Sequence, residues 1–229
     1  MTDQAWRWRK RPGGFTLIEL LVALSLMALM AVLSWRGLDG ISRAQHQLQQ
    51  RADEVLALQA TLTQWGADLD AMAEQPKLPG LDWDGRALRI LRRAGVAAGD
   101  GLRVVAWAQR VIDGQGQWLR WQSPPLQSRA ALDQAWQKAA LWAQNPSDED
   151  RLREVRTVPL SSWQIFYFRN NAWSNPLSSA DGPDASTPDA ASAATVPDGV
   201  RLVLVLPAGQ AVSGSLTRDW VRPLLGGGK

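Results

Sequence analysis

The sequence of 229 residues contains no cysteine and a single histidine, His46. The absence of cysteine excludes a disulfide framework and any zinc or iron–sulfur site with thiolate ligands. A single histidine excludes HExxH zinc sites, metal centres with several histidines and most Ser–His–Asp triads. Walker loops, GxSxG elbows and a GxGxxG turn after a strand are missing as well. We therefore expect no enzyme activity, no metal site and no cofactor.

The net charge of +3 belongs to one short segment of the chain. Residues 1–14, MTDQAWRWRKRPGG, contain four basic residues and one acidic residue, so the remainder of the chain sums to zero. The high isoelectric point, near 9.8, therefore does not describe a basic folded surface. This distribution argues against nucleic acid as a partner.

An apolar run follows this basic segment. Residues 15–35, FTLIELLVALSLMALMAVLSW, carry one charge, Glu19. As a helix the run would be roughly 31 Å long, which matches the hydrocarbon core of a bilayer. Basic residues precede it and only Arg36 follows closely, so the front of the chain should stay cytoplasmic. We expect a single-pass membrane protein with a cytoplasmic N-terminus; the resemblance described below implies an inner-membrane location and a periplasmic C-terminal domain.

Glu19 is unusual for a plain membrane anchor. A charged side chain at the centre of a membrane helix costs roughly 2.5–3.5 kcal/mol on insertion scales, so an intramembrane carboxylate implies a cationic partner at similar depth. Two glycines, Gly13 and Gly14, also separate the basic segment from the apolar run, where an anchor needs none.

These residues resemble the processing motif of type IV pilins and type II secretion pseudopilins: Gly14-Phe15-Thr16-Leu17-Ile18-Glu19 after a short basic leader. The resemblance implies that a prepilin peptidase cuts between Gly14 and Phe15 and that Phe15 is then N-methylated. It also implies that Glu19 meets the terminal amine of a neighbouring subunit during assembly. The cut would create an ammonium group four residues before this carboxylate.

The helical pattern continues beyond the membrane. Apolar residues recur at spacings of three and four from Ile41 to Leu69, which predicts an amphipathic helix over 36–75 and one helix from about residue 15 to 71. His46 lies on its polar side and is interpreted as solvated. Gly66 is near its far end, and Pro76 stops it.

Beyond Pro79 the pattern is typical of short strands. We predict an α+β fold of the pilin type over 76–229, in which the long N-terminal helix packs on antiparallel sheets, with one inserted helix at 129–143 capped by Ser128. Asp113-Gly114-Gln115-Gly116 and Pro207-Ala208-Gly209 are predicted turns. The predicted strands are 86–93, 102–111, 117–122, 163–169, 200–207 and 210–217.

Two acidic segments do not match a calcium site. Residues 174–199 are rich in Pro, Ser, Ala and Asp, which indicates a flexible loop, and their aspartates lack the spacing of a calcium-binding loop. Asp148-Glu149-Asp150 is interpreted as a helix start or a solvated cluster. Asp82 and Asp84 are interpreted as turn residues at a strand end rather than an acid–base pair.

Thirteen tryptophans allow two interpretations. Trp118, Trp121, Trp163 and Trp173, with Arg120 or Arg169 beside them, could form a platform that stacks on sugars or bases. We favour the alternative that tryptophans fill the core and interfaces.

The chain also resembles J-type minor pseudopilins of type II secretion systems. WRGLDGISRAQ after the apolar run and the region from SSWQIFYFRNNAWSNP to VRLVLVLPAGQAVSGSLTRDWVRP are similar to that family. The resemblance implies a structural subunit near the pseudopilus tip, with I- and K-type minor pseudopilins and the major pseudopilin as partners. A minor pilin of a type IV pilus, serving assembly, adhesion or DNA uptake, is the alternative. A tethered enzyme ranks last.

The assigned cut predicts the effect of one substitution. Gly14→Arg should leave the leader attached, because a side chain at the cut site blocks entry of the extended backbone into the peptidase. N-terminal sequencing of the membrane-extracted protein measures this, and a mature chain that begins at Phe15 in this variant would contradict the assignment.

Overall fold

Helix α1 (Leu17–Asp70) is the longest element of the computed structural model, at 54 residues. The structure describes residues 14–76, 78–95, 100–178 and 196–223. Thr16 precedes the first residue of α1 and caps it, because both its carbonyl and its hydroxyl accept the Glu19 N–H, at 3.1 and 3.4 Å. The predicted helix from about 15 to 71 is confirmed. The chain divides into two compact units, residues 1–50 and 51–229.

The second unit contains two antiparallel sheets. The larger has the order β1-β2-β3-β4-β5 and is a simple meander. The smaller has the order β7-β6-β8-β9. The larger sheet consists of β1 (Leu81–Trp83), β2 (Ala87–Arg93), β3 (Leu102–Ile112), β4 (Gln115–Gln122) and β5 (Glu154–Pro159). The smaller consists of β6 (Ser162–Arg169), β7 (Ala172–Ser174), β8 (Gly199–Leu206) and β9 (Gly214–Val221).

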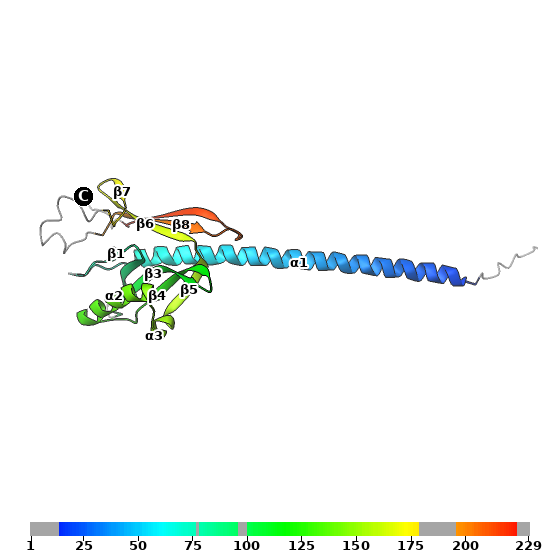
Figure 1. The fold of residues 1–229 in the computed structure, drawn as a ribbon, viewed down its shortest axis with the longest axis horizontal. Coiled ribbons are helices and arrows are strands. Elements are labelled where there is room, and N and C mark those ends of the chain that lie inside the picture. Colours follow the sequence, from blue (N-terminus) through cyan, green and yellow to red (C-terminus); the bar gives the residue numbers. More distant parts are fainter. Residues whose placement is uncertain (1–13, 77, 96–99, 179–195, 224–229) are drawn as a thin grey trace, which may run out of the picture. The chain divides into compact units, whose positions relative to one another are not determined.

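The last turns of α1 lie between the two sheets (Figure 1). Leu58, Trp65 and Leu69 of α1 belong to one core cluster with buried side chains from the inner faces of both sheets. The predicted apolar stripe is thus confirmed at its C-terminal end. Burying one helix face between two sheets explains why the helix continues so far past the apolar run.

The opposite face of the larger sheet is covered by α2 (Arg129–Gln144). The Ser128 hydroxyl accepts the Ala131 N–H, which confirms the predicted cap. The buried side chains of α2 lie on one face of the helix: Leu132, Ala135, Trp136, Ala139 and Trp142. The unit therefore stacks α2, the larger sheet, α1 and the smaller sheet, an α+β arrangement consistent with the pilin type.

Of the two interpretations of Asp148-Glu149-Asp150, the helix start is confirmed. It forms the short helix α3 (Asp148–Arg151), in which Ser147 and Asp150 make a reciprocal capping box. Asp113 and Gly114 form a two-residue turn between β3 and β4 with positive φ values of 51° and 78°. Both values are typical of a type I′ hairpin turn, so this predicted hairpin is confirmed.

The prediction of a strand at 210–217 was wrong at its start. β9 begins at Gly214, because residues 207–213 form the connection, with Gly209 at a φ of +91°. Three strands were not predicted: β1 and β7 have only three residues each, and β5 carries two exposed side chains and ends in proline. Most of the predicted loop 174–199, residues 179–195, lies outside the described residues.

Two glycines give opposite predictions for alanine. A Cβ at Gly66 of α1 would meet nothing within 4 Å, whereas a Cβ at Gly116 would lie 2.1 Å from the Leu160 carbonyl oxygen. Gly66→Ala should raise the free energy of unfolding by about 0.5–1 kcal/mol, since alanine favours the helix. Gly116→Ala should lower it by about 1–3 kcal/mol through forced displacement of the backbone.

Denaturant unfolding of the detergent-solubilised chain, followed by tryptophan fluorescence, measures both values. A Gly116→Ala chain as stable as the parent would show that the close approach of Gly116 to the Leu160 carbonyl is not required.

Candidate functional site

The predicted cut site lies in an exposed, non-helical segment just before α1. Gly14 and Phe15 are both outside the helix, and the Phe15 side chain is 78% exposed. A Cβ at Gly14 would meet nothing within 4 Å, and its φ does not require glycine. The chain's own packing therefore gives no reason for a glycine at this position.

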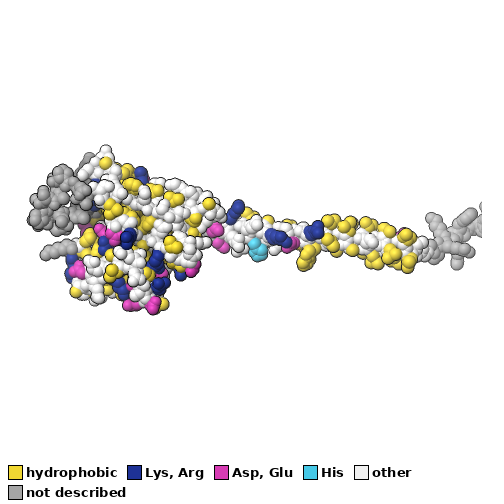
Figure 2. All heavy atoms as spheres, in the orientation of Figure 1, with side chains coloured by type: hydrophobic (Ala, Val, Ile, Leu, Met, Phe, Trp, Pro, Cys, Tyr) yellow, Lys and Arg dark blue, Asp and Glu magenta, His cyan; other side chains and the backbone are white. Residues whose placement is uncertain are grey.

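Glu19 is an isolated charge on α1. Its residue is exposed, and among the described residues no hydrogen bond or ion pair to its carboxylate is found. The next charged side chain along the helix is Arg36, about 25 Å away at 1.5 Å per residue. Figure 2 shows the intervening segment as an almost continuous run of hydrophobic side chains. No cation of this segment can reach the carboxylate.

Residues 36–50, the part of the first unit that follows the apolar run, are exposed on α1. The Arg43 guanidinium contacts the Asp39 carboxylate one helical turn away. His46 is exposed, as predicted. Among the described residues, one helix, α1, is long and apolar enough over part of its length to cross a membrane. This helix fits a single-pass anchor.

The second unit is organised around a buried carboxylate that the sequence did not reveal. Asp68 of α1 is 0% exposed. Its oxygens accept hydrogen bonds from Arg120 Nε at 2.7 Å and Arg120 Nη2 at 2.8 Å. They also accept from Trp107 Nε1 at 2.9 Å, from Gln64 Nε2 at 3.0 Å and from Arg92 Nη1. Asp68 thereby links α1 to three strands, β2, β3 and β4.

The smaller sheet is attached to the end of α1 by similar contacts. Trp220 Nε1 of β9 donates to Asp70 Oδ1 at 2.8 Å, and Arg222 Nη2 donates to Glu74 Oε1 at 2.5 Å. For Asp68, which was not among the predicted site residues, the sequence does carry a signal: Asp68 falls between Trp65 and Leu69 on the apolar side of the predicted helix. A carboxylate at such a position requires a buried cation.

The tryptophans fill the core rather than form a platform. Nine of the eleven tryptophans that the structure describes are buried, and Trp118, Trp121 and Trp163 are at most 9% exposed. Arg120, proposed beside them, is 9% exposed and bound to Asp68. Only Trp173 of the four candidates is half-buried, with the Arg201 guanidinium 4.2 Å from its ring centroid. The stacking-platform alternative was therefore wrong for three of its four residues.

The candidate carboxylate pair is structural. Asp84 Oδ1 accepts the backbone N–H groups of Arg86 and Ala87 at 2.9 and 2.8 Å, which is the turn predicted from the sequence. Asp82 pairs with Arg89. Burial raises the pKa of the nearby Tyr167 phenol well above its ordinary value. Among the described residues no group of three or more His, Cys, Asp or Glu side chains could hold a metal ion.

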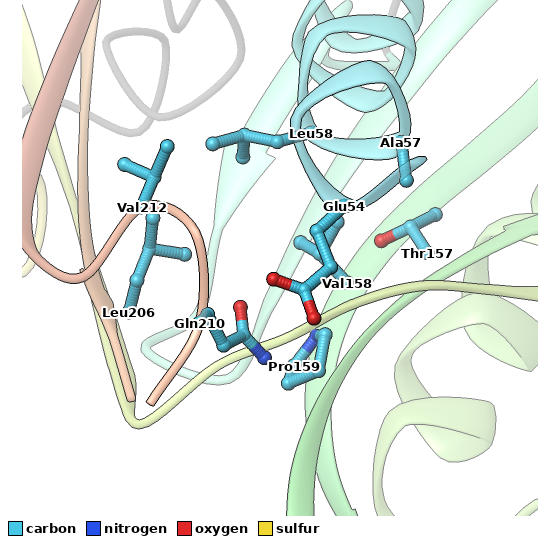
Figure 3. Close-up of a pocket in the computed structure, with 9 residues that line it drawn as sticks. All are labelled: Glu54, Ala57, Leu58, Thr157, Val158, Pro159, Leu206, Gln210 and Val212. Carbon is cyan, nitrogen blue, oxygen red and sulfur yellow. The ribbon is translucent and has the colours of Figure 1, made fainter. Parts of the chain in front are cut away.

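A pocket of about 150 Å³ lies between α1, the end of β5 and the loop from β8 to β9 (Figure 3). It is smaller than the ~300–1,000 Å³ typical of sites for small molecules. Glu54 Oε2 accepts the Ala211 N–H at 2.7 Å, so this carboxylate holds the loop on α1. The walls are mainly apolar, and the Thr157 hydroxyl donates to the Trp118 carbonyl rather than into the pocket. The arrangement is that of a structural contact.

The comparisons with known proteins concern the N-terminal segment and part of the chain. Residues 9–35 match the family described as the prokaryotic N-terminal methylation motif. The chain is 29% identical over 92 residues to type II secretion system protein J of Klebsiella pneumoniae. The alignment covers 40% of this chain and 44% of that protein, so the chain spans less than half the length of this relative.

The long apolar N-terminal helix, the antiparallel sheets and the methylation motif define a pilin-like α+β protein with a prepilin-type N-terminus. Within that class, the similarity to protein J supports a J-type pseudopilin of type II secretion. The resemblance identified from the sequence is thereby confirmed.

The buried carboxylate gives a prediction on stability. Asp68→Asn should lower the free energy of unfolding by about 3–5 kcal/mol. The substitution removes the negative charge that compensates the guanidinium groups of Arg120 and Arg92 at this buried site. Asp53→Asn, on the exposed face of the same helix, should change it by less than about 0.5 kcal/mol. Urea unfolding of both solubilised variants measures the difference, and equal stabilities would contradict a central role for Asp68.

Proposed function

We propose that this protein is a minor pseudopilin of a type II secretion system, a structural subunit at or near the pseudopilus tip. The observation that carries this proposal is the Glu19 carboxylate, which has no counter-charge among the described residues and lies four residues after a Gly14–Phe15 bond. We assign no catalytic role to the chain.

The proposed role of Glu19 depends on processing. Cleavage after Gly14 by a prepilin peptidase leaves Phe15 as a free amino terminus, which is then N-methylated. Phe15 and Thr16 precede the helix, so the new ammonium group lies at the end of an apolar helix. When two such helices pack together, the ammonium group of one subunit comes close to the Glu19 carboxylate of the next. Each charge then compensates the other in a low-dielectric environment.

Before assembly the apolar segment is stored in the inner membrane. We propose the division predicted from the sequence: leader 1–14, membrane and assembly helix 15–35, helix continuation 36–75 and periplasmic domain 76–229. The basic leader holds the N-terminus in the cytoplasm. The partners are the I- and K-type minor pseudopilins and the major pseudopilin, with the prepilin peptidase as processing enzyme. The N-terminal motif is shared with type IV pilins, and the similarity to protein J favours secretion.

Removal of the carboxylate tests this role. Glu19→Ala should leave cleavage after Gly14 largely intact and lower co-purification with the I- and K-type pseudopilins by about tenfold, since one charge-assisted contact is lost. Quantitative mass spectrometry of affinity-purified complexes from cross-linked membranes measures the yield.

Ser25→Ala is the matched control in the same segment. The Ser25 hydroxyl donates to the Leu21 carbonyl of its own helix at 2.8 Å, so this substitution should leave the yield unchanged. Full co-purification of the Glu19→Ala protein would refute the proposed role of Glu19.

A further inference from the structure

The four sheet edges of the second unit differ in how they are protected. Strands β1 and β7 have only three residues each. The ladder between β4 and β5 has a register irregularity, and β5 ends in Pro159. Short strands, bulges and prolines are the devices by which natural proteins block unwanted pairing at an edge. β9 has eight residues, no proline and a regular ladder with β8.

The backbone of β9 presents unused hydrogen-bonding groups. The Arg222 N–H donates to the Asp198 carbonyl, which places even-numbered residues toward β8. Because orientation alternates in an antiparallel ladder, the N–H and C=O groups of Ser215, Thr217, Asp219 and Val221 point away from the sheet. Within the described parts of the chain none of these groups has a partner. The edge therefore offers four residues for a further strand.

The side chains along this edge lower the desolvation cost of adding a strand against β9. Val221 is 70% exposed, and Val205 of the neighbouring strand is also exposed. Asp219 makes a two-pronged ion pair with Arg201, at 2.8 and 2.7 Å. These hydrogen bonds hold the pKa of Asp219 below its usual value, so the pair stays ionised and mutually neutralised.

One charge on this edge is left without a counter-ion. The exposed Arg218 makes no hydrogen bond or ion pair with any residue that the structure describes. A second copy of this chain is a poor source of a carboxylate for it, because the acid on its own β9, Asp219, is already bound to Arg201. Charge complementarity therefore favours a different chain.

We propose that β9 is a docking edge that takes an extended segment of another polypeptide as an added strand, with an Asp or Glu of that segment facing Arg218. Main-chain hydrogen bonds supply the affinity, and the carboxylate and the apolar contacts with Val221 supply the specificity. This inference goes beyond the proposed function and does not rest on it. The added strand is defined by its extended backbone and its carboxylate, and not by the kind of protein that supplies it.

A zero-length cross-link tests the contact with Arg218. The full chain carrying Arg218→Lys is produced in its native membranes, where the introduced amine keeps the positive charge. A carbodiimide then joins this amine to a carboxylate that lies against it. We expect an amide bond from position 218 to an Asp or Glu of a different chain, located by mass spectrometry. The absence of a cross-link at position 218, or one to a second copy of this protein, would overturn the proposal.

A second substitution at residue 217 tests strand pairing itself. Thr217→Pro removes an outward N–H and leaves the hydrogen bonds to β8 in place, as proline on an edge strand can. Combined with Arg218→Lys, it should lower the cross-link yield by about tenfold, whereas Thr217→Val keeps the N–H and should preserve the yield.

Tryptophan fluorescence of the solubilised variants shows that the sheet is intact, since Trp220 of β9 contacts Asp70 of α1. Equal yields from the two residue-217 variants would overturn strand addition. The Arg218→Lys experiment stands independently of the proline variant.

Discussion

The folded unit depends on one carboxylate. Asp68 lies at the C-terminal end of α1, fully buried, and its two oxygens accept five hydrogen bonds from four side chains of α1, β2, β3 and β4. Burying an ion is costly unless its charge and its lone pairs are satisfied together. Since these donors come from separate strands, they can meet only when α1 sits on the sheet in one register. Toward the smaller sheet, the exposed carboxylates of Asp70 and Glu74 accept hydrogen bonds from Trp220 and Arg222.

The same helix carries a second carboxylate in the opposite situation. Glu19 has no counter-charge among the described residues, and the nearest charged side chain on its helix is Arg36. Asp68 is satisfied within the chain and organises a fold, whereas the role that we propose for Glu19 is to meet a cation of another subunit. Under this proposal a single helix serves first as a membrane segment and then as an assembly element, while its other end anchors a domain. β9 resembles Glu19 in this respect, since its outward backbone groups and Arg218 have no partner within the described part of the chain.

Local patterns predicted the fold well where the signal was strong. The apolar periodicity of α1, the cap and buried face of α2, and the Asp-Gly turn between β3 and β4 are all encoded within a few consecutive residues. The three unpredicted strands gave only weak local patterns, because β1 and β7 have three residues each and β5 has two consecutive exposed side chains and ends in proline. The start of β9 shifted because a loop held by Glu54 replaced its first residues.

The residues of the candidate site also differ in how far they could be predicted from the sequence. Gly14, Phe15 and Glu19 could be selected from the sequence because their order is unusual for a plain anchor, and their roles remain predictions, since each depends on another protein. Asp68 could not be assigned from the sequence, because its partners Arg92, Trp107 and Arg120 lie 24 to 52 residues away along the chain. The tryptophans, in contrast, were considered for a binding site from the sequence, and nine of them are buried in the core.

Processing of the chain as a prepilin, followed by assembly through its new N-terminus, is the proposal on which the function depends. Intact-mass and N-terminal mass spectrometry of the protein extracted from its native membranes measures this processing. We expect a chain that begins at Phe15 and carries one additional methyl group on that residue. A chain that retains residues 1–14, or one that begins at Phe15 without the methyl group, would contradict it.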